Sequence, residues 1–238
     1  MRLLFWNMGR NDNAALALEC MRIHGVSVAA FAEYSGTDFS DELLRGAGYR
    51  VVGKGGCDKI VMLTDVSIGV ANNFEASRFT VFALESPEAR FVVAATHLVD
   101  RISASDSEAR LEDIRELMGV VRGYEEALTI NKTVVMGDFN ANPYDKELLL
   151  PNAFNAMLFK GIVKARPSRT WHGKYYPFMY NPTLHWLSED TETYGSHYYS
   201  SGDGANPIWN CYDQALVSPA LMDGVRDYGY LKKIGDKD

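Results

Sequence analysis

The sequence predicts an α/β (α+β) protein in which strands and helices pack in layers. Three observations indicate this class. Strand-like and helix-like segments alternate near the N-terminus, several short strands occupy residues 49–96, and a long amphipathic helix at 105–122 precedes a further strand. The continuous apolar segment at residues 26–32 is typical of a strand that is buried on both faces.

The first elements follow directly from the apolar pattern. Residues 2–6 form a short apolar strand that Asn7 closes, and apolar positions in residues 14–23 predict a helix. Gly25 is expected to end this helix because glycine adopts the left-handed conformation readily. The apolar strand at 26–32 stops at Glu33, and residues 41–47 predict a second, shorter helix.

The middle of the chain changes to a pattern of short strands. Gly, Asn, Asp and Pro separate these segments, as hairpin connections require. The last of the segments, FVVAAT, ends at His97. The predicted strands are residues 49–52, 59–63, 67–71, 79–84 and 91–96.

The helix at residues 105–122 is the clearest in the sequence. Ser105 and Glu108 form a capping-box pattern, and five apolar residues follow at helical spacing. A strand from Thr133 then ends at Asp138. Residues 166–210 are rich in Tyr, Trp, Pro, Asn and Gly and predict long ordered loops, since so many aromatic side chains need burial. A final strand is expected at 211–217.

Composition restricts the class of protein more than its function. The chain has 238 residues, 47% of them hydrophobic, which is typical of a globular protein. The formal net charge of −7 lacks the basic excess of most nucleic-acid-binding proteins. A local basic patch or bound cations would supply a positive field, so this class is not excluded.

Cysteine usage and hydropathy predict a cytoplasmic protein. Cys20, Cys57 and Cys211 lie far apart without a CxxC pair, which argues against a zinc site or a disulfide framework. Free thiols in a reducing compartment are expected. No run of ~18 apolar residues predicts a transmembrane segment, and the N-terminus lacks a secretory signal.

Polar side chains follow the strands at the points where each strand ends. Asn7, Glu33, His97 and Asp138 hold these positions, and Asp213 lies within the last strand. Each residue alone has an ordinary structural explanation, because loops begin where strands end. Together, carboxylates, amides and an imidazole suit a site in which Mg²⁺ or Mn²⁺ binds a phosphate and an acid activates water.

Several motifs carry a family resemblance. They are WN at 6–7, AE at 32–33, ATHL at 95–98, MGDFNANP at 136–143 and YDQALVS at 212–218. In this order they resemble the endonuclease/exonuclease/phosphatase superfamily, which has the deoxyribonuclease-I-like fold. The resemblance implies that residues 1–238 form a single domain, a four-layer sandwich of two mixed β-sheets that pack face to face between helices.

The resemblance also implies a role for each motif residue. Glu33, with Asn7 beside it, would bind the catalytic Mg²⁺ or Mn²⁺. Asp138 would orient or deprotonate the attacking water, Asn140 would hold a phosphate oxygen, and His97 would donate to the scissile phosphate. Strand alternation would place Asp138 and Asn140 on one face, with Phe139 pointing into the core.

One family motif has no counterpart. Asp213 resembles the acid that orients a second histidine, which the family supplies from a later Ser-Asp-His sequence. No such sequence occurs before Asp238, and none of the other histidines lies in that context: His24, His172, His185 and His197. Either the chain is truncated before its last strand, which would leave a strand edge unpaired, or the protein binds without cutting.

The resemblance leaves the substrate open. A nuclease that hydrolyses DNA or RNA is the main hypothesis; the alternatives are a phosphatase or phosphodiesterase acting on a small molecule or lipid, and a catalytically silent binding module. FMYNPTLHW, GSHYYSS and WNCYDQALVS resemble a bacterial branch of the superfamily, which does not specify the substrate. Arg169, Tyr199 and Trp209 are candidate substrate-binding residues: the aromatic side chains would stack on bases or, alternatively, fill a secondary core.

Overall fold

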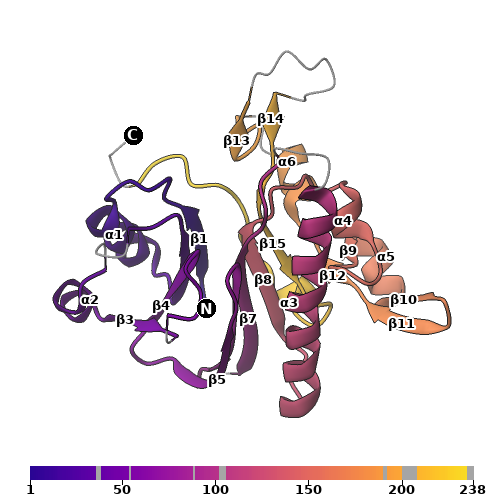
Figure 1. The fold of residues 1–238 in the computed structure, drawn as a ribbon, viewed down its shortest axis with the longest axis horizontal. Helices are drawn as coiled ribbons and strands as arrows, with labels where there is room; N and C mark the ends of the chain where they lie inside the picture. The colour runs from indigo at the N-terminus through magenta and orange to yellow at the C-terminus, as the bar shows by residue number, and fades with distance from the viewer. Residues whose placement is uncertain are drawn as a thin grey trace.

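The computed structural model describes residues 1–35, 39–53, 55–87, 89–101, 106–189, 192–199 and 208–234. A four-stranded sheet on one side contains β1, β2, β4 and β3 in that spatial order (Figure 1). β1 runs parallel to β2, and the other neighbours are antiparallel, so the sheet is mixed. The strands are β1 (Leu3–Asn7), β2 (Val28–Ala32), β3 (Tyr49–Val52) and β4 (Ile60–Asp65).

A seven-stranded sheet faces the first. Its order is β5-β6-β7-β8-β15-β12-β9, with β7 parallel to β8 and β15 antiparallel to β8. The strands are β5 (Gly69–Glu75), β6 (Phe79–Glu85), β7 (Arg90–His97), β8 (Thr133–Asp138), β9 (Ala156–Met157), β12 (Met179–Tyr180) and β15 (Asp213–Val217).

Helices cover the outer faces of both sheets (Figure 1). Leu18 and Met21 of α1 pack against Phe31 of β2, and Ile114 of α3 packs against Val81 of β6. Gly25 ends α1 with φ of 60°, as predicted. The helices are α1 (Ala14–His24), α2 (Asp41–Ala47), α3 (Asp106–Leu128), α4 (Lys146–Leu149), α5 (Lys160–Ala165) and α6 (Thr183–Glu189), with a 3₁₀ turn at Met222–Gly224. Ser105, the predicted cap of α3, lies outside the described residues.

The inner faces of the two sheets share a core. Ala30 and Met62 from the four-stranded sheet pack with Phe82 and Val93 from the seven-stranded sheet. Every residue of β2 is buried because a sheet covers one of its faces and helices cover the other. This arrangement confirms the predicted four-layer sandwich of two mixed sheets between helices.

The prediction of long loops over residues 166–210 is wrong in part. Strands β10 (Ser168–Trp171) and β11 (Lys174–Pro177) form a hairpin that extends from the body of the molecule (Figure 1). His172 and Gly173 have φ of 46° and 74°, and positive φ at both positions is what a tight two-residue turn requires. β13 (His197–Tyr198) pairs with β14 (Trp209–Asn210) in a second small sheet.

Two other predictions concern the edges and the cysteines. Within the described residues β1 pairs with β2 and with no further strand, so β1 has an open edge. Cys20, Cys57 and Cys211 are buried and free. None of the helices in the described ranges has the length and apolar character needed to span a bilayer.

Candidate active site

Four polar side chains meet where strands of the two sheets end. Asn7 is the last residue of β1 and Glu33 follows β2, while His97 and Asp138 end β7 and β8. Because β1 is parallel to β2 and β7 to β8, each pair of strands ends at one edge of its sheet. Face-to-face packing of the sheets brings the two edges together.

Gly137 allows β8 to end beside β7. A Cβ atom at this position would lie 2.0 Å from the carbonyl oxygen of Thr96, which is closer than any side chain can approach. Only glycine therefore fits without a shift of the backbone. The glycine of the MGDFNANP motif thus sets the position of Asp138 relative to His97.

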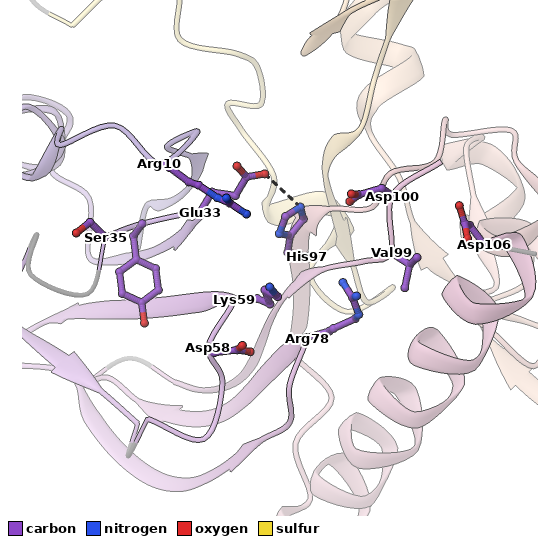
Figure 2. A pocket seen from close by; sticks show the side chains of 11 residues that line it. Arg10, Glu33, Ser35, Asp58, Lys59, Arg78, His97, Val99, Asp100 and Asp106 are labelled. Atoms are coloured by element: carbon purple, nitrogen blue, oxygen red, sulfur yellow. Dashed lines mark ion pairs between the residues drawn. The ribbon is translucent and has the colours of Figure 1, made fainter. Parts of the chain in front are cut away.

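The four side chains form one connected cluster. Nδ2 of Asn7 lies 3.2 Å from Oε1 of Glu33 and 3.2 Å from Oδ2 of Asp138. Nε2 of His97 lies 3.7 Å from the same Glu33 oxygen and 3.8 Å from the same Asp138 oxygen. Figure 2 shows Glu33 and His97 facing each other across the cluster. Glu33 is the most exposed of the charged members, with 32% of its side chain accessible.

Asp138 is nearly buried. Burial raises the pKa of its carboxyl, although hydrogen bonds from the Asn140 backbone and Asn7 and the nearby imidazoles of His97 and His197 act in the opposite direction. Its Oδ1 accepts the backbone N–H of Asn140 at 2.9 Å, and Oδ2 accepts from Asn7. Hydrogen bonds therefore hold both carboxylate oxygens of Asp138 in place, and little of this side chain is exposed to water.

Asn140 does not lie where strand alternation predicts. β8 ends at Asp138, and Asn140 has a φ of 46°, in the left-handed region. The turn begins because the Asp138 carboxylate binds the Asn140 N–H, and Nδ2 of Asn140 donates to the Leu98 carbonyl at 2.9 Å. Phe139 is fully buried against Phe154, as expected. The alternation argument holds for Phe139 and is wrong for Asn140.

Asp213 lies beside Asp138 in the antiparallel ladder of β15 and β8. Burial, followed by the charges of Asp138 and Glu33, raises the pKa of Asp213 to about 8, although a hydrogen bond from Ser196 opposes the shift. Its Oδ1 is buried and accepts no hydrogen bond from the part of the chain that the structure describes. Asp213 is the residue for which the resemblance implies a second histidine, and no histidine of the described part of the chain donates to its Oδ1.

The donor set suits a hard divalent cation. No group of three or more His, Cys, Asp or Glu among the described residues is arranged to hold a metal ion by itself. Mg²⁺ commonly binds through one or two carboxylates and takes its other ligands from water and substrate phosphates. Glu33 is accessible, and the charges of Asp138 and Glu33 add to burial in raising the pKa of Asp213, a contribution that a cation beside these carboxylates would offset. Asn7 presents Nδ2, a donor, to the carboxylates of Glu33 and Asp138, while its Oδ1 accepts the backbone N–H of Gly9. In this arrangement Asn7 positions Glu33, and its role as a cation ligand stays a prediction.

The structure separates the three predicted substrate-binding residues. Arg169, on β10, lies over the ring of Phe178, which packs with Val134 and Val217 at the opposite ends of β8 and β15 from Asp138 and Asp213. The structure therefore does not bring Arg169 to the cluster. Tyr199 and Trp209 belong to the segment of β13 and β14, which is attached beside Asp213, and both are exposed.

A cleft of about 650 Å³ adjoins the cluster on the side of β6 (Figure 2). Glu33 and His97 form one wall, and Arg10, Lys59 and Arg78 contribute cations. None of these three residues is among those predicted from the sequence. Lys59 begins one predicted strand and Arg78 immediately precedes another, but nothing in their spacing shows that they converge on His97.

Comparison with known proteins adds evidence on the fold. No family model matches the sequence, and no curated protein matches it. Among solved structures, an endonuclease/exonuclease/phosphatase family protein from Bacteroides thetaiotaomicron superposes with a TM-score of 0.50, covering 91% of this chain and 82% of that chain at 12% identity. The chain has the endonuclease/exonuclease/phosphatase fold.

Other structures with this fold align over similar lengths. Truncated TDP2 from Caenorhabditis elegans gives a TM-score of 0.58 at 13% identity over 90% of this chain and 82% of that chain. The mannosyl-6-phosphatase of Bacteroides thetaiotaomicron gives 0.54 at 11% identity over 92% and 85%. The fold of this chain thus occurs in a protein named a mannosyl-6-phosphatase and in one named for the endonuclease/exonuclease/phosphatase family, so the substrate has to be argued from the site.

Proposed function

We propose that the protein is a divalent-metal-dependent phosphodiesterase that hydrolyses nucleic acid. The observation that carries this proposal is the convergence of Asn7, Glu33, His97 and Asp138 at the joined strand ends of two sheets. The resemblance described above assigns phosphoester hydrolysis to residues in these positions, and the fold is that of proteins named as phosphatases and nucleases.

Asp138 is the group that we assign to the attacking water. Its carboxylate is held by Asn7 and by the Asn140 N–H, so one orientation is fixed before substrate binds. A carboxylate in this position accepts a proton from water as the water oxygen attacks phosphorus. Burial raises the pKa of Asp138, which makes the carboxylate a stronger base than an exposed aspartate near neutral pH.

His97 is placed to stabilise the phosphoryl group. Its Nε2 faces Glu33 and Asp138, and its Nδ1 is buried and has no hydrogen-bond partner among the described residues. The Nε2–H group of His97 would donate to a phosphoryl oxygen as negative charge builds. The new bond joins the water oxygen to phosphorus, the opposite P–O ester bond breaks, and the departing alkoxide takes a proton from solvent.

Glu33 would hold the cation beside the phosphate. A bound Mg²⁺ or Mn²⁺ would supply Lewis-acid stabilisation of the phosphoryl oxygens. Glu33 is suited to this role because its carboxylate is accessible from the cleft, whereas that of Asp138 is nearly buried.

A non-catalytic binding role is the second candidate. The observation that favours it is the buried Oδ1 of Asp213, which has no partner in the described part of the chain. A protein of this kind would bind a phosphoester in the same site and release it unchanged. The two candidates predict different results with substrate and metal.

The purified protein should be incubated with single-stranded, double-stranded and phosphomonoester substrates in Mg²⁺, Mn²⁺ or EDTA. The proposal predicts metal-dependent release of product from a phosphodiester, and loss of that activity in Glu33→Ala. Cleavage of the monoester alone would favour a phosphatase. Binding without cleavage in either metal would favour the silent module.

A further inference from the structure

Four residues form a row across the end of the seven-stranded sheet. The carbonyl of Arg78, just before β6, accepts the N–H of His97 at 3.0 Å, and His97 pairs with Asp138 across β7 and β8. Asp138 in turn pairs with Asp213 across β8 and β15. Since neighbouring strands lie ~4.8 Å apart, Arg78 stands roughly 10 Å from Asp138, on the side away from Asp213.

Cations surround the Arg78 end of this row. Lys59 and Arg78 point into the space beside His97, and Arg10 extends from the Glu33 side (Figure 2). Within the described residues Arg10 and Lys59 make no ion pair, whereas Arg78 lies 3.7 Å from Asp113. The cleft also contains carboxylates, those of Glu33, Asp58, Asp100 and Asp106. A mixed lining of this kind suits a phosphodiester, with one negative charge, better than a dianionic monoester.

Aromatic side chains occupy the other end of the row. Ser196 Oγ accepts the backbone N–H groups of Tyr212 and Asp213 at 3.1 and 2.9 Å, which fastens the β13 strand beside Asp213. The ring of His197 stacks on that of Tyr212, with centroids 5.2 Å apart, and the Arg101 guanidinium also lies over the Tyr212 ring, 5.9 Å from its centroid. These contacts attach the aromatic side chains of the β13–β14 segment to β15, the strand that contains Asp213.

Beyond Tyr212 the rings are exposed to solvent. Tyr198 and Trp209 face each other across β13 and β14 at 5.2 Å, and Tyr194 contacts Trp209 at 6.1 Å. The exposed fractions are 56% for Tyr198, 39% for Trp209 and 65% for Tyr194. Tyr198 and Trp209 pair across the two strands, on the face of this ribbon opposite to His197, and exposed rings of this kind are suited to stacking on nucleobases.

We propose that the substrate is a single-stranded nucleic acid that lies along this row. The scissile phosphate would sit at His97 and Asp138, a flanking phosphate would bind Arg10, Lys59 and Arg78, and a base would stack on Tyr198 and Trp209. The base has to be unpaired, because in a duplex its faces are covered by neighbouring pairs. This inference rests on the proposed function for the scissile position, but the two flanking contacts are testable by binding alone.

Binding should be measured by fluorescence anisotropy with the Asp138→Asn variant and a labelled oligonucleotide, single-stranded or annealed to its complement. We expect tighter binding of the single strand. Tyr198→Ala and Trp209→Ala should each weaken it by about 5-fold or more, the effect of losing one stacked base. Lys59→Ala should weaken it and reduce the slope of log Kd against log salt by about 0.7, the value for one phosphate contact on a single strand. Tyr175→Ala and Lys174→Ala on the β10–β11 hairpin are the matched controls and should change nothing.

Cleavage by the otherwise unsubstituted protein separates failure of this inference from failure of the proposed function. Bis(p-nitrophenyl) phosphate offers a scissile diester without a flanking phosphate or base. Lys59→Ala and Tyr198→Ala should raise KM for the single strand by a larger factor than KM for the small diester. Equal binding of single strand and duplex, or no effect of the variants on binding, would overturn the inference even if hydrolysis occurs. Single-strand binding that follows the predicted pattern without hydrolysis of any substrate would uphold it and overturn the proposed catalysis.

Discussion

Nδ2 of Asn7 donates to Oδ2 of Asp138 at 3.2 Å, although the two residues are 131 positions apart. Asn7 belongs to the four-stranded sheet and Asp138 to the seven-stranded sheet. The same Asn7 nitrogen also faces Glu33. One amide therefore links the carboxylate that we assign to the cation with the carboxylate that we assign to water, and it does so only when both sheets are packed.

Replacement of Asn7 by alanine should reduce the rate without unfolding the protein. The variant loses the donor to both carboxylates, and a hydrogen bond to a charged group contributes about 1.5–3 kcal/mol. We expect kcat to fall roughly 10-fold or more. The measurement is kcat at saturating metal, with Asn72→Ala on the exposed edge strand β5 as the control. A full rate in Asn7→Ala would mean that Asp138 is held well enough by Asn140 alone.

Asp138→Asn should remove the base while keeping the shape of the side chain. The expected loss in kcat is about 10²-fold or more, the usual size for a catalytic acid–base group. Thermal unfolding should be measured in parallel, because the amide can still accept from the Asn140 N–H. If Asp138→Asn kept wild-type activity, the assignment of the water to Asp138 would be wrong.

Glu33→Gln should weaken metal binding in preference to chemistry. The neutral amide removes the most accessible carboxylate of the cluster, so a higher Mg²⁺ concentration should be needed for half-maximal rate. Titration of activity with Mg²⁺ tests this, and Glu42→Gln on the exposed surface of α2 provides the control. An identical titration in Glu33→Gln would exclude Glu33 from the cation site.

Arg110→Met should destabilise the protein. Arg110 and Glu147 form a buried ion pair at 2.9 Å, and Arg110 also donates to the carbonyls of Val99 and Asp100, which follow His97. Removing one partner leaves Glu147 buried and unpaired, at a cost of about 3–5 kcal/mol. Urea denaturation should show this loss. Arg110→Met with Glu147→Leu should recover part of the stability, and a double variant no more stable than the single one would contradict the explanation.

The same ion pair makes stability depend on acidic pH. Burial raises the pKa of Glu147, but hydrogen bonds from the backbone, Arg110 and Ser107 outweigh it, so the pKa lies below the usual value. The pair therefore stabilises the fold above the unfolded pKa of about 4.3 and loses its effect as pH falls further. Glu147→Gln should reduce this acid dependence in urea titrations at pH 3 and pH 6.

Ionisation of Asp213 should lower the stability of the fold as pH rises toward 8, whereas the Glu147 pair loses its effect as pH falls. Its pKa of about 8 in the folded state exceeds the ordinary value of 3.8, so between these pH values the folded state binds more protons than the unfolded state. Stability then falls as pH rises through this window. Asp213→Asn removes the ionisation, and its stability relative to wild type should increase from pH 5 to pH 8 when both are measured in EDTA. Parallel stability curves would mean that Asp213 is not destabilised by burial and its neighbours.

The order of most elements and the polar residues at the strand ends follow from the amino-acid sequence alone. Apolar periodicity is a local property, so the strands that end near Asn7, Glu33, His97 and Asp138 could be read directly from it. The motifs at these positions also indicated the four-layer sandwich, which the structure confirms. Phe139 was placed correctly in the core because it follows the strand that determines its direction.

How these residues meet, and which side chains surround them, depends on the packing of the two sheets. Asn140 lies in a turn beyond the strand, where its backbone N–H donates to the Asp138 carboxylate, and the β10–β11 hairpin depends on positive φ at His172 and Gly173. The cationic residues of the cleft, Arg10, Lys59 and Arg78, come from separate segments that no common sequence pattern connects. Their convergence on His97 is set by the packing of two sheets, and distances across such an interface are not encoded in any local pattern.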